Sequence, residues 1–153
     1  MSTYGGHGTY HNPPILGCRL TNSANQSIPS ATATALTFDT EVYDTGQLHN
    51  ATFPARITFP RSGTVFAGGV VDWAAPAAGI VTTLALLLNN TTTLAAVSHP
   101  DMVLGGFFQT VNSSLRVAPG DFLTLIVIQS GVAALNSVAA GQIPGFWAVL
   151  WPD

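Results

Sequence analysis

The sequence predicts an all-β fold of antiparallel strands, and three observations lead to it. Short apolar segments, several with a period of two, recur along the chain at intervals of about 8 to 15 residues. Gly, Pro, Asn and Asp fill the gaps between these segments, as tight turns require. No amphipathic helix of ordinary length is present. About eight to ten strands arranged in this way are typical of a β-sandwich or barrel.

The composition is unusual in its shortage of charge. Of 153 residues, 7% are charged, against about 25% in ordinary soluble domains, and the net charge is -3. Such a chain lacks the basic surface that nucleic acid requires, so we expect no nucleic-acid partner. Few charges also favour an oligomer that hides uncharged surface, and a monomer covered by Thr, Ser and Asn is the alternative. The single cysteine, Cys18, excludes an intrachain disulfide and is expected to be a small buried apolar side chain.

The first 14 residues differ from the rest. They are rich in Gly, Tyr, His and Pro, follow neither the helix nor the strand period, and end in two prolines. We expect residues 1–14 to form a flexible attachment arm that precedes one domain over residues 15–153. The candidate attachment residues are Tyr4, His7, Tyr10 and His11. The two histidines would suit a metal if they lay on a helix, but the neighbouring glycines disfavour one.

Targeting signals do not appear in the sequence. The first residues have neither the basic start nor the apolar core of a signal peptide, and the apolar run at residues 84–88 is too short to span a bilayer. We therefore expect a chain that is made in the cytoplasm and does not insert into a membrane.

The first half of the domain contains four candidate strands, at residues 15–20, 31–38, 56–59 and 64–73. The fourth carries Gly68 and Gly69 in its interior, which indicates a bulge or the close approach of another backbone.

The next strands follow a clear turn signal. Residues 80–88 and 92–97 are expected to form a hairpin, because Asn89 and Asn90 tolerate the left-handed conformation of a tight turn. Another strand is expected over residues 103–117, with an interruption at Asn112 and Ser113.

A second hairpin is predicted around the turn at residues 118–121, between residues 115–117 and 122–128. In residues 122–128 both alternating faces are mostly apolar, so this strand needs two covers. One cover is the opposite sheet, and the other is another subunit or an unusually dry part of the fold.

The last strand, residues 145–151, is also apolar on both faces. An exposed edge of that composition would invite aggregation, so we expect this strand inside a sheet. The chain must then return to the middle of a sheet, which indicates a jelly roll or Greek key.

Three carboxylates, Asp39, Glu41 and Asp44, lie close together before residue 46. They could hold calcium or act as a catalytic pair, but a solvated loop ending in a turn is the simpler interpretation. Residues 98–101 are predicted to form another turn. The candidate recognition loops are 39–52, 74–79 and 98–106, with candidate residues Tyr43, Asp44, His49, His99 and Asp101.

Catalysis is not expected. The pairs His49 with Asp44 and His99 with Asp101 are near enough in sequence to imagine an acid–base pair, but no nucleophile elbow accompanies them. No cofactor fingerprint is found either, so we expect no cofactor.

The order of turns resembles that of the C1q/TNF-like jelly roll, in particular the C1q-like domain of bacteriophage virion proteins. The resemblance covers roughly residues 16–153. It depends on the residues at 36–46, on a Pro-x-x-Gly turn at 60–63, on Asn89 with Asn90, on the Gly-Asp turn at 120–121, and on the terminal Trp-Pro-Asp. No collagen-like repeat precedes the domain, which favours a viral or bacterial setting.

The resemblance implies a homotrimer in which one sheet of each subunit packs around a three-fold axis. It also implies a non-enzymatic virion protein, either a receptor-binding tip or a capsid-surface decoration. Its partners would be other virion proteins or a host receptor, which could be a glycan. A soluble carbohydrate- or ligand-binding protein is the alternative. The candidate interface and core residues are Phe66, Trp73, Leu84, Leu86, Phe107, Phe122, Leu125, Val127, Trp147 and Trp151.

Overall fold

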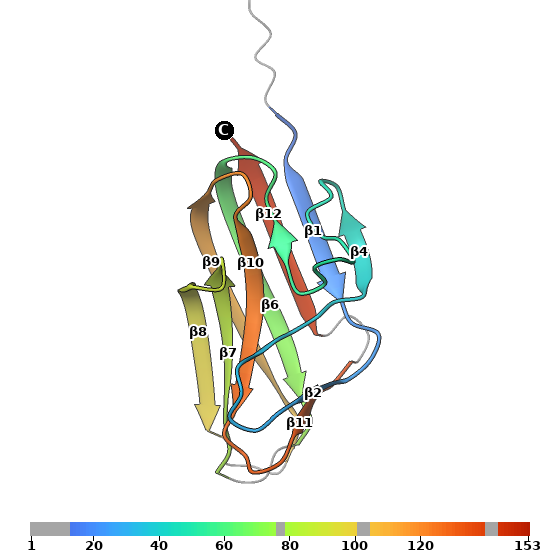
Figure 1. Ribbon diagram of the computed structural model, residues 1–153, viewed down its shortest axis with the longest axis vertical. Coiled ribbons are helices and arrows are strands. Elements are labelled where there is room, and N and C mark those ends of the chain that lie inside the picture. Colours follow the sequence, from blue (N-terminus) through green and yellow to red (C-terminus); the bar gives the residue numbers. More distant parts are fainter. Residues whose placement is uncertain (1–12, 76–78, 101–104, 140–143) are drawn as a thin grey trace, which may run out of the picture.

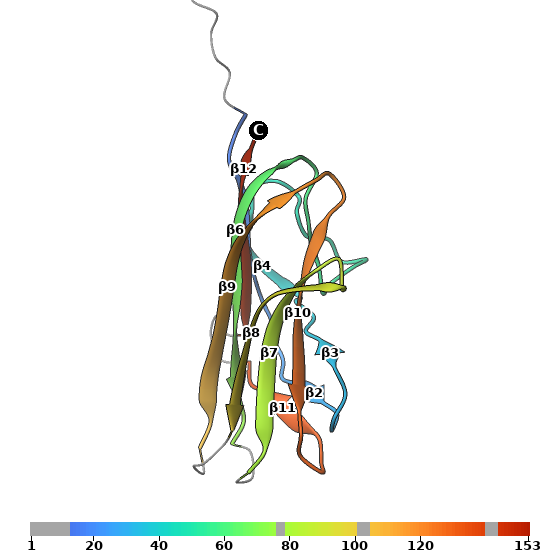
Figure 2. The same ribbon diagram turned by 90° about the vertical axis from the view of Figure 1, so that its left-hand side faces the viewer.

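The structure is a computed structural model that describes residues 13–75, 79–100, 105–139 and 144–153. The described residues form two antiparallel sheets packed face to face (Figures 1 and 2). Sheet A contains β1 (Leu16–Thr21), β2 (Gln26–Ile28), β4 (Thr40–Asp44), β6 (Gly63–Trp73), β9 (Phe107–Val117), β11 (Leu135–Ser137) and β12 (Gly145–Pro152). Sheet B contains β3 (Thr34–Ala35), β5 (Ile57–Thr58), β7 (Val81–Leu88), β8 (Thr92–Pro100) and β10 (Phe122–Gln129). The predicted all-β sandwich is confirmed.

The last strand lies inside sheet A, as predicted. β12 pairs with β1 on one side and with β6 on the other, and β9 and β4 flank this group. The inward side chains of β12, Phe146 and Leu150, are fully buried, whereas Trp147 and Val149 point to the outer face and are half-buried. The two apolar sides of this strand therefore meet different surroundings.

The predicted hairpin at residues 118–121 is wrong. The turn exists, with the Asp121 amide donating to the Ala118 carbonyl at 3.1 Å, and Gly120 has a φ of 90°. However, β9 pairs with β6 in sheet A, whereas β10 pairs with β7 in sheet B. The turn carries the chain from one sheet to the other, because turn chemistry fixes a reversal and not the partner of the next strand.

The hairpin at Asn89 and Asn90 is confirmed. These residues have φ angles of 52° and 59°, and β7 pairs with β8 across the turn. The strand continues through Ser98, His99 and Pro100, where the sequence predicted a turn. β9 is likewise uninterrupted at Asn112 and Ser113, since both pair with β6.

Two other segments differ from expectation. Most of residues 31–38 is irregular, with Ala31 at a φ of 51° and only Thr34–Ala35 in a strand. Residues 40–44 form the edge strand β4, where a loop was expected, because their backbone pairs with β1.

The core lies between the sheets. Cys18 is fully buried, as predicted, and burial raises the pKa of its thiol. Gly69 faces this core, where a Cβ would collide with Leu125 of sheet B. The glycine pair therefore allows close approach, and the pairing of β6 with β9 and β12 runs through it without a bulge. No helix in the described part of the chain is long and apolar enough to cross a bilayer.

Candidate interaction surface

Large apolar side chains gather on the outer face of sheet A. Strand alternation points Phe66 of β6, Phe108 of β9 and Trp151 of β12 away from the core. They are 44%, 61% and 44% exposed, respectively. Half-buried Trp147 and Val149 lie on the same face, and Ile15 lies with Trp151 beside a cavity at its upper end. We call this set the aromatic face.

One outward-facing glycine makes room for a ring of this face. A Cβ at Gly68 would lie 2.6 Å from Cζ2 of Trp147, so the indole covers that glycine. Gly68 lies opposite Trp147 in the pairing of β6 with β12, so the role of this glycine can be recognised only once the strand order is known.

An arginine interrupts the apolar surface. Arg19 of β1 lies between Trp147 of β12 and Tyr43 of β4 in the strand register, and the three side chains line a cavity of about 350 Å³. Its Nε is buried and has no hydrogen-bond acceptor in the described residues. One nitrogen of this cation is therefore buried between two rings without an acceptor.

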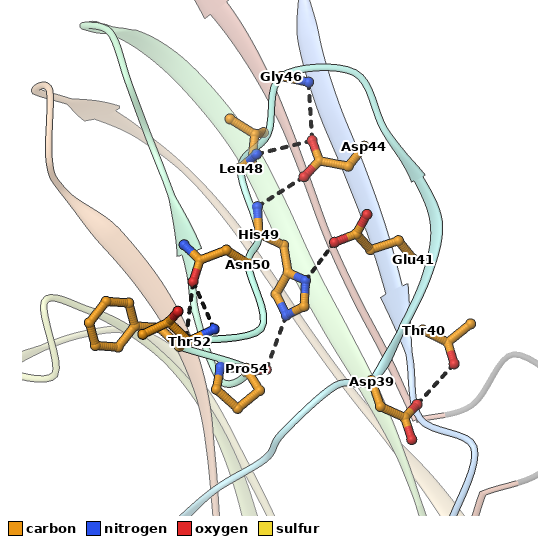
Figure 3. Close-up of polar contacts among 11 residues, drawn as sticks. Asp39, Thr40, Glu41, Asp44, Gly46, Leu48, His49, Asn50, Thr52 and Pro54 are labelled. Carbon is orange, nitrogen blue, oxygen red and sulfur yellow. Dashed lines mark hydrogen bonds and ion pairs between the residues drawn. The ribbon is translucent and has the colours of Figure 1, made fainter.

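A second site is built around Asp44 at the end of β4 (Figure 3). Its Oδ1 accepts the amide hydrogens of Gly46 and Leu48, each at 3.0 Å, and its Oδ2 accepts that of His49 at 2.9 Å. Three amide donors fix the path of residues 45–49, which includes Gln47 at a φ of 52°. Asp44 is therefore a structural residue of this turn.

This turn places His49 against β4. Its Nδ1 lies 2.9 Å from Oε1 of Glu41, and its Nε2 lies 3.4 Å from the Pro54 carbonyl (Figure 3). The residues beside it line a surface cavity of about 490 Å³: Phe38, Asp39, Glu41, His49, Ala51 and Pro54. Among the described residues that line it, none is a Ser, Thr or Cys nucleophile, and both imidazole nitrogens face groups of the chain itself. The imidazole of His49 therefore links β4 to the loop that follows it, and we call this contact the His49 clasp.

The other two carboxylates of this segment are also engaged. The carboxylate of Asp39 accepts hydrogen bonds from the backbone amide of Ser23 at 2.9 Å and from the Ser23 hydroxyl at 2.5 Å. These hydrogen bonds lower the pKa of Asp39, and the bond from the Ser23 hydroxyl makes the largest contribution. Within the described residues, no group of three His, Cys, Asp or Glu side chains is placed to hold a metal ion.

The predicted interface and core candidates divide into three groups. Those fully buried in the core are Trp73, Leu84, Leu86, Leu125 and Val127. Those half-buried are Phe107, Phe122 and Trp147. Those exposed on the aromatic face are Phe66 and Trp151. Sequence reasoning missed Phe108, Ile15 and Arg19 on this face.

The recognition candidates are not brought together. Tyr43 belongs to β4 and the aromatic face, whereas His49 is buried in its clasp. His99 lies on β8 and packs against Phe107, with 5.0 Å between ring centroids. The remaining candidates, Asp101 and the arm residues Tyr4, His7, Tyr10 and His11, lie outside the described residues.

Comparison with known proteins supports the fold alone. No family model and no curated sequence matches the chain. The structure is similar to that of murine APRIL, with a TM-score of 0.63 and 11% identity over 90% of this chain and 99% of the other. It is similar also to Eiger TNF from S. frugiperda, with a TM-score of 0.63 and 12% identity over 92% and 95% of the two chains. The protein therefore has a TNF-like jelly-roll fold.

Proposed function

We propose that the protein is a non-enzymatic, homotrimeric structural module of a virion surface, acting in host attachment as a receptor-binding tip or as a capsid decoration. The observation that carries the proposal is the aromatic face. Phe66, Phe108 and Trp151 are large apolar side chains that are exposed on one sheet of a chain that is 7% charged, and a second copy of the chain would cover them. Cyclic association buries such a face in a closed assembly without forming a filament.

The two ends of the sandwich suggest how such a module would be mounted. β1 begins and β12 finishes at the same end, since Leu16 pairs with Leu150 (Figure 1). The β6–β7 and β8–β9 connections start and finish at the opposite end, because Trp73 pairs with Phe107 and Val81 with Pro100. The arm would attach the trimer to its particle, and the far end would carry recognition.

The alternative, a soluble carbohydrate-binding protein, is favoured by one feature. The Arg19 cavity combines a cation with the rings of Tyr43 and Trp147, which are groups that can stack on a sugar. This function requires the aromatic face to stay open, so it competes with the trimer. Glycan-array binding by a monomer would support it.

Deletion of residues 1–14 tests the main proposal. We expect the shortened chain to remain a folded trimer and to be lost from particles, as seen by electron microscopy with a labelled antibody to this protein. Full-length protein provides the control and should label the particle surface. If full-length protein does not label the particle surface, the virion role is contradicted. If the shortened chain is incorporated as well as the full-length chain, the attaching role of the arm is contradicted.

A further inference from the structure

Two half-buried charged groups on the outer face of sheet A, Arg19 and Asp72, have no charged partner within the described residues. The partnered carboxylates are Asp39 with Ser23, Glu41 with His49, Asp44 with three amides, Asp121 with Ala118 and Asn89, and Asp153 with Arg116. Asp72 has no hydrogen-bond or ion-pair partner for its carboxylate in this part of the chain. Among the four arginines, Arg19 is the one with a buried guanidinium nitrogen that lacks an acceptor. Both groups are half-buried, so each is partly desolvated and would be stabilised by an opposite charge from a neighbouring surface.

Arg19 and Asp72 share the outer face of sheet A but occupy opposite halves of it. Arg19 lies between the inward residues Cys18 and Leu20 of β1, next to edge strand β4. Asp72 lies between the inward residues Val71 and Trp73 of β6, next to β9. Their separation across the sheet means that the two charges belong to different patches of one face.

A cyclic trimer needs this arrangement. In a ring of odd order, each interface joins two different patches, so one half of the face meets the other half in the next copy. We propose that Arg19 of each subunit binds Asp72 of the neighbouring subunit, which gives three intersubunit ion pairs. The proposal rests on the trimer of the proposed function and deepens it by naming the residues that fix subunit register.

The surroundings favour such a pair. The rings of Trp147 and Tyr43 flank Arg19 and would exclude water from the contact. Burial raises the pKa of Asp72, so its carboxylate is already partly desolvated in the single chain and would regain stabilisation from a guanidinium.

The register adds a geometric consequence. Arg19 lies opposite Trp147, and Trp147 lies opposite Gly68, four residues before Asp72. At about 3.3 Å per residue this offset is roughly 13 Å along the strands. Rotation about the three-fold axis does not change the height of a residue along that axis. The strands must therefore run obliquely to the axis if Arg19 of one subunit is to meet Asp72 of the next.

A double-mutant cycle tests the pairing by sedimentation velocity over a dilution series. We expect Arg19→Met or Asp72→Asn to weaken the trimer by about 10- to 100-fold, and Arg19→Glu or Asp72→Arg to weaken it further. The reversed pair R19E/D72R should regain most of the loss. The matched control is T83A/S98A, which removes an exposed side-chain hydrogen bond of 2.8 Å made within one chain between β7 and β8 of sheet B and should leave association unchanged.

The outcomes separate the pairing from the trimer. A wild-type monomer would overturn both the proposed function and this inference. A wild-type trimer in which the R19M and D72N effects simply add, with no recovery in R19E/D72R, would overturn the pairing alone. Circular dichroism and thermal unfolding of each variant show whether the fold is intact. If a reversal variant does not fold, the neutral cycle of R19M and D72N decides the result.

Discussion

The outer faces of the two sheets differ in the size of their apolar side chains. On sheet A, Phe66, Phe108 and Trp151 are large and exposed. On sheet B, the outward residues of β7 and β10, such as Ala85 and Ile126, are smaller or half-buried, and only Val81 among the described residues is a large exposed hydrophobic on those strands. The difference teaches that an apolar pattern on both sides of a strand does not by itself predict large exposed side chains. Residues 122–128, which are apolar on both sides, lie in sheet B, and the exposed aromatics lie in sheet A.

The largest expected effect comes from placing a charge on each outer face. Phe66→Asp should weaken the trimer by roughly 100- to 1000-fold, because a carboxylate would be buried at its centre. Val81→Asp is the matched control on sheet B, since Val81 is exposed to a similar degree, 40% against 44%. Sedimentation equilibrium measures both. Equal weakening by the two variants would break the proposed distinction between the faces.

The next effect concerns the polar link that joins the sheets. Nε1 of Trp73 donates to Oε1 of Gln109 at 2.7 Å, and Nε2 of Gln109 donates to the Thr82 carbonyl of β7 at 3.1 Å. Gln109→Leu removes the acceptor of the buried indole N–H, so the free energy of unfolding should fall by about 1–3 kcal/mol. Urea unfolding measures it. A loss below about 0.5 kcal/mol would show that this link does not hold the sheets together.

Gly68 tests how the aromatic face is supported. A methyl group there would lie 2.6 Å from both the Trp147 ring and the Val111 carbonyl, so Gly68→Ala should cost about 1–3 kcal/mol. Gly105→Ala is the control, because open space surrounds that position. Thermal unfolding of the two variants gives the comparison, and equal stability would mean that the indole moves aside freely.

The smallest effect is a pH dependence at the turn between the sheets. The amide of Ala118 and the side chain of Asn89 donate to Asp121 and lower its pKa. The ionised group therefore stabilises the fold above its unfolded pKa of about 4, and this contribution is lost as pH falls through the lower folded value. Asp121→Asn should lower stability at pH 7, and the difference from wild type should shrink near pH 3. A difference that is constant with pH would contradict this origin.

Much of the architecture could be predicted because it depends on local chemistry. Asn89 and Asn90 adopt the left-handed turn that their residue type permits, and the two apolar sides of residues 145–151 require an interior strand. The change of sheet after Val117 could not be predicted, since Gly120 and Asp121 would form the same turn in a hairpin. Pairing between distant strands, not turn type, decides where β10 lies.

The candidate site was harder to predict for the same reason. Tyr43 and Trp147 are far apart in sequence and meet Arg19 only because β1 lies between β4 and β12. The sequence predicts Asp44 in a recognition loop, but its carboxylate accepts the amide hydrogens of residues 46, 48 and 49. The sequence indicates which residues are unusual, and the strand order decides what they contact.

The mass of the wild-type chain in solution tests the central claim most directly. Sedimentation equilibrium or native mass spectrometry at micromolar concentration should give three times the chain mass of 15.9 kDa. That result would agree with burial of the aromatic face of sheet A in a closed ring. A single species of 15.9 kDa would contradict it and leave Phe66, Phe108 and Trp151 open to solvent.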